Sequence, residues 1–285
     1  MQFERYVPRG RLSRHVRFLW ASERPPQHHS QERLLPTGEM GLFVDVSDTS
    51  SSPPLLAGAS SRPRVLNTAQ SISMLGVSFA PGGASSLFRT PVSEIANLTL
   101  PLEDFCGGSA LALQAEILEA TTNSVRFRVL ERYLEALLAA TDAPGHAAVR
   151  YALGELRSVR EVKISDLISC MGIGQRRFIE LFRREVGLTP KLYQRVARFQ
   201  KVLASIENHR DIVWSDVALL HRYFDQAHLI HDFNTFAGVS PTVYLRRRSS
   251  RNHVTLPVSS NGNFLQSSAR RFHHDTASPS LRTKT

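Results

Sequence analysis

The chain has 285 residues, of which 42% are hydrophobic, and its 35 basic and 25 acidic side chains give a formal net charge of +10. This composition excludes a wholly disordered chain and suits one large domain or two ordinary ones, while its two cysteines are too few for a disulfide scaffold or a four-cysteine zinc site. The sequence contains no run of about 18 apolar residues, and residues 1–20 lack the apolar core of a signal peptide, so we expect a soluble, cytoplasmic protein with no membrane partner.

The N-terminal region is predicted to be rich in short strands. Residues 42–46 and 73–79 are apolar or alternating runs, which are typical of strands. Turn-forming stretches border these runs at residues 47–54 and 81–83. Several short strands at this spacing indicate a small β-barrel or sandwich.

Helical periodicity follows the strands. Apolar side chains within residues 130–138 recur at i, i+3, i+4, i+7 and i+8, which places them on one face of a helix, and residues 141–145 are predicted to form a linker. We therefore expect an α+β chain, with a barrel or sandwich and its following helices in residues 1–140 and an all-α domain in residues 147–246. The C-terminal tail, residues 249–285, is rich in Ser, Asn, Thr and Arg without an apolar period, and we expect it to be disordered.

The all-α domain contains two similar pairs of helices. In the first pair, a short helix that Ser165 could cap precedes a turn, where Gly172 supplies a positive φ. The second helix begins near Gln175 and ends at Gly187, and Pro190 opens the helix that follows. Four side chains of this second helix have the spacing of a buried face: Phe178, Leu181, Phe182 and Val186.

The second pair repeats this pattern. Its second helix begins near Asp225, and Gly238 and Pro241 repeat the stop and restart of the first pair. The shared motif is Phe-x-x-x-x-Gly-[LV]-[ST]-Pro-x-x-Tyr, and its two copies start 51 residues apart, at Phe182 and Phe233. The side chains predicted to be buried in this second helix are Leu229, Phe233 and Phe236.

A helix predicted for residues 192–206 could join the two pairs rigidly. About 15 residues of helix span about 22 Å, so both pairs could enter successive major grooves of DNA, about 34 Å apart, from one side.

The positive charge is concentrated in the all-α domain: the net charge is −1 for residues 1–146, +7 for residues 147–248 and +4 for residues 249–285. A basic domain of this kind favours a polyanionic partner, usually nucleic acid, although a basic surface exposed to solvent is the plain alternative.

Residues 147–246 resemble the AraC/XylS-type DNA-binding domain, which has two helix-turn-helix units on a linking helix. The resemblance is carried by Tyr223–Phe233, which reads YFDQAHLIHDF, followed by Gly-Val-Ser-Pro-x-x-Tyr at residues 238–244. Residues 1–140 resemble a sensor-type N-terminal domain of some members. The segments that carry this second resemblance are Leu35-Pro36-Thr37-Gly38, Phe79-Ala80-Pro81-Gly82-Gly83-Ala84 and Leu102-Glu103-Asp104-Phe105.

The resemblance implies a sequence-specific DNA-binding transcription regulator under the control of a sensor domain. Its implied partners are double-stranded DNA and a small-molecule effector, and it leaves open RNA polymerase and a second copy of the chain. A different class of protein also stays open, namely a small-molecule-binding or metal-dependent cupin-like barrel with a secondary DNA-binding module.

The chain departs from the family pattern at four positions. Ile168 stands where a small Ala is usual, and Glu180 and His231 stand where a basic residue is frequent. Glu180 would repel a phosphate but could accept a hydrogen bond from a cytosine amine. Arg222 occupies a turn position where Gly is usual, so it needs either a strained backbone, at a cost on the order of 1 kcal/mol, or an ordinary conformation.

The free faces of the two second helices define the candidate DNA-binding residues. Base readout is assigned to Gln175, Arg176, Ile179 and Glu180 in the first unit and to Gln226, Ala227, Ile230 and His231 in the second. Phosphate contact is assigned to Arg177, Arg183, Arg184, Arg195, Arg198 and Asn234. We interpret the phenylalanines of both units as core residues.

We expect neither a metal nor a cofactor nor an enzymatic activity. His221, His228 and His231 cluster in the second unit, but the helix-turn-helix fold accounts for them without zinc. The stretch His28-His29-x-x-Glu32 faintly resembles cupin ligands, yet adjacent histidines of a strand point to opposite sides, so we interpret it as an exposed loop. The sequence contains no nucleophile elbow, phosphate loop or zinc motif.

Overall fold

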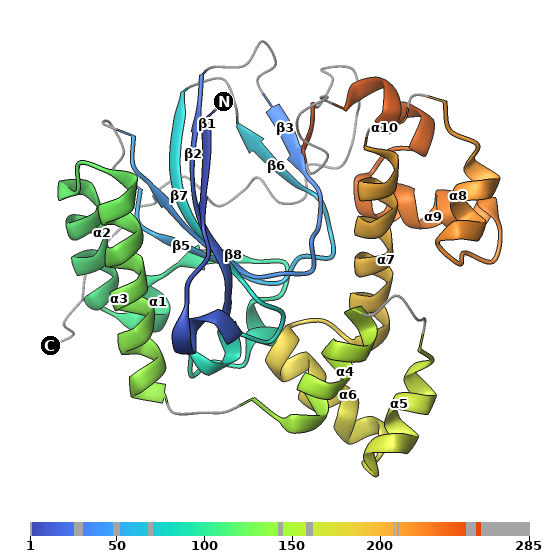
Figure 1. Cartoon of the computed structure of the whole chain (residues 1–285), viewed down its shortest axis with the longest axis horizontal. Coiled ribbons are helices and arrows are strands. Elements are labelled where there is room, and N and C mark those ends of the chain that lie inside the picture. Colours follow the sequence, from blue (N-terminus) through green and yellow to red (C-terminus); the bar gives the residue numbers. More distant parts are fainter. Residues whose placement is uncertain are drawn as a thin grey trace, which may run out of the picture.

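The computed structural model describes residues 2–25, 31–47, 52–67, 71–141, 145–157, 162–207, 209, 211–248 and 255–257. Within these residues an N-terminal β-rich half is followed by helices, and a helical C-terminal half packs beside it (Figure 1). The expected α+β class is confirmed.

A six-stranded antiparallel sheet forms the centre of the N-terminal half. Its strands, in spatial order, are β1 (Gln2–Tyr6), β2 (Val16–Arg24), β7 (Ile72–Phe79), β4 (Gly41–Asp45), β5 (Leu55–Ala57) and β8 (Thr99–Pro101). The two apolar runs predicted as strands are confirmed as β4 and β7, which pair with each other with Leu42 opposite Val77. Both side chains are fully buried, as alternation along a strand with one buried face requires.

A second, three-stranded sheet lies between the main sheet and the helical half. It has β3 (Gln31–Leu34) in the middle, flanked by β6 (Arg64–Asn67) and β9 (Thr255–Pro257). Strand β9 belongs to the C-terminal tail that we expected to be disordered, and the backbone pairing of its three residues with β3 departs from that expectation. The remaining residues of the tail lie outside the described residues.

Three 3-10 helices and three α-helices of the described residues complete the N-terminal half. They are the 3-10 helices η1 (Gly10–Arg14), η2 (Ala84–Ser86) and η3 (Val92–Ile95), and the α-helices α1 (Glu103–Cys106), α2 (Ser109–Glu119) and α3 (Asn123–Thr141). The periodic face predicted in residues 130–138 is confirmed in α3, where Leu130, Leu134 and Leu138 are buried. The predicted linker starts at the last residue of α3, and residues 142–144 lie outside the described residues.

The helical half has the two predicted helix-turn-helix units, one toward each end of a long helix (Figure 1). The first unit consists of α5 (Ile164–Met171) and α6 (Gln175–Val186), with α4 (Ala147–Arg157) packed against α6. The second unit consists of α8 (Trp214–Leu220) and α9 (Gln226–Ala237), followed by α10 (Pro241–Arg247). The linking helix α7 (Pro190–Ile206) begins two residues before the predicted start, because Thr189 caps it and Pro190 takes its first position.

The hydrophobic core divides within α7 and not at the predicted linker. One cluster runs from the main sheet through η2 and η3 into the first unit and ends at Leu188 and Tyr193. The other cluster joins α7 to the second unit and includes Leu35 from the N-terminal half. The sheet domain and the first unit therefore share one core, while the second unit has a core of its own.

Candidate nucleic-acid interface

The turn of the first unit has the geometry that its sequence indicates. Gly172 has φ +64°, as predicted for a tight corner between two helices. The predicted cap is wrong, because Lys163 is the N-cap of α5 without a side-chain bond. Ser165 is already inside the first turn of that helix and bonds Asp166 instead, at 3.1 Å.

The buried side of α6 fixes which of its faces is free. Phe178 and Phe182 are fully buried, with their ring centroids 5.8 Å apart, and Leu181 and Val186 are buried beside them. All four residues are therefore core residues, as the spacing predicts. The opposite side of α6 carries the four candidate base-reading residues, which together border one shallow surface hollow: Gln175, Arg176, Ile179 and Glu180.

Glu180 does not present an isolated negative charge to a partner. The Nε atom of Arg176 lies 3.2 Å from Oε1 of Glu180 one turn away, and the two side chains are 94% and 54% exposed. An exposed pair at i, i+4 is worth only about 0.3–0.5 kcal/mol. Arg176 therefore offsets the repulsion between Glu180 and a phosphate, and the pair can open at little cost when a base edge approaches.

The second unit has a strained turn and a well-capped helix. Arg222 has φ +56°, so of the two conformations considered for it the strained one is present. The carbonyl of Arg222 accepts a hydrogen bond from Nη1 of Arg198 at 3.2 Å. Helix α9 then starts with Asp225 as its N-cap, whose carboxylate accepts from the backbone N–H of His228 at 2.7 Å.

The side of α9 that faces the core is also buried. Phe199 of α7 lies 5.2 Å from the ring of Phe233 and 5.4 Å from that of Phe236, and all three rings are buried. The candidate base-reading face lies on the other side, where Gln226, Ala227 and His231 are exposed and Ile230 is partly buried. The structure thus brings each predicted set together on one free helix face, and the role of each residue stays a prediction.

The six candidate phosphate contacts fall into two groups. Four are exposed on the recognition helices, namely Arg177, Arg183, Arg184 and Asn234. The other two, Arg195 and Arg198, lie on α7 and have partners within the chain. The guanidinium of Arg198 also lies over the ring of Tyr223, 4.8 Å from its centroid.

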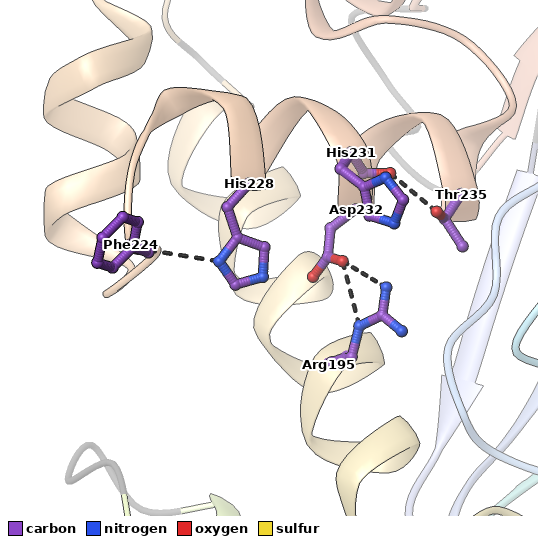
Figure 2. A network of polar contacts seen from close by, with 6 residues as sticks. All are labelled: Arg195, Phe224, His228, His231, Asp232 and Thr235. Carbon is purple, nitrogen blue, oxygen red and sulfur yellow. Dashed lines mark hydrogen bonds and ion pairs between the residues drawn. The ribbon is translucent and has the colours of Figure 1, made fainter.

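Arg195 is bound to a carboxylate that the sequence patterns missed. Its Nη2 and Nε donate to Oδ1 of Asp232 at 2.6 and 3.1 Å, as Figure 2 shows. The Asp232 side chain is fully buried, and burial first and the Asp232 charge second raise the pKa of the neighbouring Tyr223. The available signal was the repeat itself, because the residue 51 positions earlier is the buried Leu181.

Two histidines of the second unit, His221 and His228, form side-chain hydrogen bonds within the chain. A hydrogen bond of 2.7 Å joins Nε2 of His221 to the hydroxyl of Ser205, and Nδ1 of His228 accepts from the backbone of Phe224 at 3.4 Å (Figure 2). Burial first and the charge of Lys201 second lower the pKa of His221. In the part of the chain that the structure describes, no three His, Cys, Asp or Glu residues are grouped to hold a metal ion.

The cupin-like stretch is described only in part. Glu32 is buried, and one of its carboxylate oxygens accepts a hydrogen bond from Nη1 of Arg24 at 2.8 Å. His28 and His29 lie outside the described residues, so the predicted loop is not tested there.

Among the helices of the described residues, none combines the length and the apolar character needed to cross a membrane.

The N-terminal half contacts both helix-turn-helix units. Helix η3 packs against α6 of the first unit. In the second unit, Nη1 of Arg33 donates to the carbonyl of Ala237 at the end of α9, at 2.9 Å. Between the two units, Nε2 of Gln200 on α7 donates to the carbonyl of Pro36 at 2.7 Å.

Two family models match separate parts of the chain. Residues 4–101 match a domain of unknown function (DUF6597), and residues 167–247 match a helix-turn-helix domain. No curated protein matches the sequence.

The chain also aligns with solved structures at low sequence identity. One structure of ToxT from Vibrio cholerae O395 is 11% identical, with a TM-score of 0.43, and the match covers 80% of this chain and 97% of that chain. A structure of unsaturated fatty acid bound wild-type ToxT from Vibrio cholerae strain SCE256 is also 11% identical, with a TM-score of 0.42 and coverage of 80% and 94%.

Two helix-turn-helix units with free polar faces, joined by one helix in a basic domain, define a DNA-binding transcription regulator. Residues 167–247 match the helix-turn-helix model within the region that resembles the AraC/XylS-type DNA-binding domain, which places the DNA-binding domain in the C-terminal half.

Proposed function

We propose that the chain reads DNA by inserting α6 and α9 into two successive major grooves. The observation that carries this proposal is the position of two free faces at the ends of one rigid helix. Helix α7 has 17 residues and is therefore about 25 Å long. The two units can thus reach the same side of a duplex within one helical turn, which is about 34 Å.

Each free face offers chemistry that suits base edges. Arg176 can pair with guanine, and Gln175 and Gln226 can pair with adenine, each through two hydrogen bonds. Ile179, Ala227 and Ile230 can contact a thymine methyl group, Glu180 can accept from a cytosine amine, and His231 can hydrogen-bond a base edge. The exposed Arg177, Arg183, Arg184 and Asn234 border these faces, where phosphates pass.

The test begins with selection of a preferred DNA fragment from a random library by the full chain. Binding to the selected fragment and to a scrambled fragment is then compared across a range of salt concentrations. We expect tighter binding to the selected fragment and a steep loss of affinity with salt. Equal affinity for both fragments at physiological salt would refute the proposal.

Two arginines of α6 separate base contact from phosphate contact. Arg176→Ala should cost roughly 1–3 kcal/mol of binding free energy and relax the sequence preference at one position. Arg184→Ala, the matched control on the same helix, should weaken binding to all sequences alike and lower the salt slope by about 1. Matching effects from the two variants would contradict the assignment of Arg176 to a base.

Control of DNA binding by the N-terminal half is a second part of the proposal. Because that half contacts α6 through η3 and α9 through Arg33, a small-molecule effector that shifts it would change the spacing of the recognition helices. Small molecules can be screened by the shift they cause in the unfolding temperature of the full chain, and each hit is then added to the DNA-binding assay. A hit that stabilises the protein without changing its affinity for DNA would contradict effector control by that compound.

The remaining expectations stay predictions. They concern a cytoplasmic location, a second copy of the chain and RNA polymerase as partners. Sedimentation of the full chain, with and without the selected DNA, measures whether two copies associate.

A further inference from the structure

A buried ion pair joins the linking helix to the recognition helix of the second unit. Arg195 comes from α7 and Asp232 from α9, and their side chains are 28% and 0% exposed. Two nitrogens of Arg195 donate to the single oxygen Oδ1, while Oδ2 of Asp232 is buried without a hydrogen bond. A buried carboxylate in this state depends chiefly on its cation, because the attraction between the two charges offsets the cost of removing the carboxylate from water.

The first unit shows that packing alone does not require this charge. The position equivalent to Asp232 is Leu181, which is buried against its own core. Apolar residues at such positions stabilise a protein at least as well as a buried ion pair does, whereas the pair adds direction. The second unit therefore has a directional contact where the first unit has a non-directional one.

The contact fixes the rotation of α9 about its axis. Asp232 and His231 are consecutive residues, about 100° apart around the helix axis; Asp232 points to Arg195 of α7 and is buried, whereas His231 is exposed (Figure 2). The guanidinium of Arg195 also lies over the ring of Phe236, 5.3 Å from its centroid and one turn further along. Arg195 thus holds two successive turns of α9, which limits both the rotation and the tilt of that helix.

We propose that the Arg195–Asp232 pair positions α9 so that its base-facing side chains keep a fixed orientation relative to α6. Arg195 is then a positioning residue that sets the sequence specificity of the second unit, and not the phosphate contact that its charge indicates. The inference rests on the proposed function, because it requires that α9 reads DNA. If Arg195 left Asp232 for a phosphate, the buried carboxylate would lose its ion-pair partner.

The experiment uses the full chain with both residues replaced, Arg195→Met together with Asp232→Leu. The leucine copies the first unit, the methionine keeps most of the length of the arginine stem, and the net charge of the protein does not change. Thermal unfolding is measured first, and a cooperative transition shows that the variant folds. Arg184→Met is the matched control, because it removes an exposed arginine that has a predicted phosphate role.

Two quantities are measured on DNA fragments that carry substitutions in either half-site. These are the ratio of affinities for the original and the substituted half-site, and the dependence of affinity on salt. For the double variant we expect at least a tenfold loss of discrimination at the half-site read by α9, with discrimination by α6 and the salt slope unchanged. For Arg184→Met we expect a salt slope lower by about 1 and unchanged discrimination at both half-sites.

A third variant, Arg195→Lys, keeps the charge and loses the planar fork of donors. A positioning role predicts that this variant also loses discrimination at the half-site read by α9, whereas a phosphate contact would survive it. The inference is overturned if the double variant lowers the salt slope while discrimination persists, or if it changes neither quantity. Failure of the proposed function is distinguishable, because the unmodified chain would then fail to discriminate at either half-site.

Discussion

The turns of the two units predict opposite effects on stability when glycine is introduced in one and removed from the other. Gly172 and Arg222 both have a positive φ, +64° and +56°. A residue with a Cβ atom in this region costs roughly 1–2 kcal/mol, and the extra freedom of glycine in the unfolded chain offsets about 0.4–1 kcal/mol of that. We therefore expect Arg222→Gly to be about 0.5–1 kcal/mol more stable than Arg222→Ala, which serves as the reference for loss of the side chain.

The reverse change in the first unit completes the test. A Cβ atom added at Gly172 meets no atom within 4 Å, so Gly172→Ala is strained only by its backbone and should lose about 1 kcal/mol. Urea unfolding followed by tryptophan fluorescence and circular dichroism measures both changes in the free energy of unfolding. In a thermal unfolding experiment each kcal/mol should shift the unfolding temperature by about 2–4 °C. If Arg222→Gly is no more stable than Arg222→Ala, the backbone of Arg222 is not strained and the reasoning fails.

Three further predictions concern the second unit. Phe199→Ala should lower the free energy of unfolding by roughly 3–5 kcal/mol, because the ring is fully buried between two other rings. Leu219 is 79% exposed, so the control variant Leu219→Ala should change the free energy of unfolding by less than about 0.5 kcal/mol in the same urea titration. Asp225→Ala removes the N-cap of α9 and should cost about 1 kcal/mol, whereas Asp225→Ser should retain most of the stability. Because the pKa of His221 is lowered in the folded protein, the unfolded state binds the proton of this histidine first as the pH falls below 6.5, and the free energy of unfolding decreases in that range. His221→Gln should show a smaller decrease between pH 7 and pH 5. An equal decrease in both proteins would show that His221 does not cause the loss of stability.

Local patterns account for the parts of the fold that were predicted. Gly187 and Gly238 have φ +90° and +66°, as the end of each recognition helix requires, and each is followed by the proline that restarts the chain. The apolar spacing around Phe182 and Phe233 assigned the buried faces, and hence the free faces, because a helix presents a fixed angle per residue. The strained turn at Arg222 was one of the two conformations considered from the sequence, because the two units share a turn and the second has Arg222 where the first has Gly172.

Contacts between distant residues account for what was missed. The partner of Arg195 lies 37 residues away on another helix, and no periodicity links the two positions. The charge of Arg195 indicated a phosphate contact because a sequence shows a charge and not what neutralises it. The core shared by η3 and the first unit could not be predicted for a similar reason. The apolar residues of each segment follow a local pattern, and a local pattern does not show which distant segment packs against it.

The pairing of β9 has a consequence for how the chain is made. Arg33 in β3 pairs on one side with Val65 and on the other with Leu256, so the last neighbour of this early strand is synthesised after the whole DNA-binding domain. The small sheet is therefore completed late, through a pairing of high contact order. Any shortened version that stops before residue 255 leaves one edge of β3 with unpaired backbone groups, and such an edge recruits strands from other molecules. The isolated N-terminal half should for that reason aggregate more readily than the full chain.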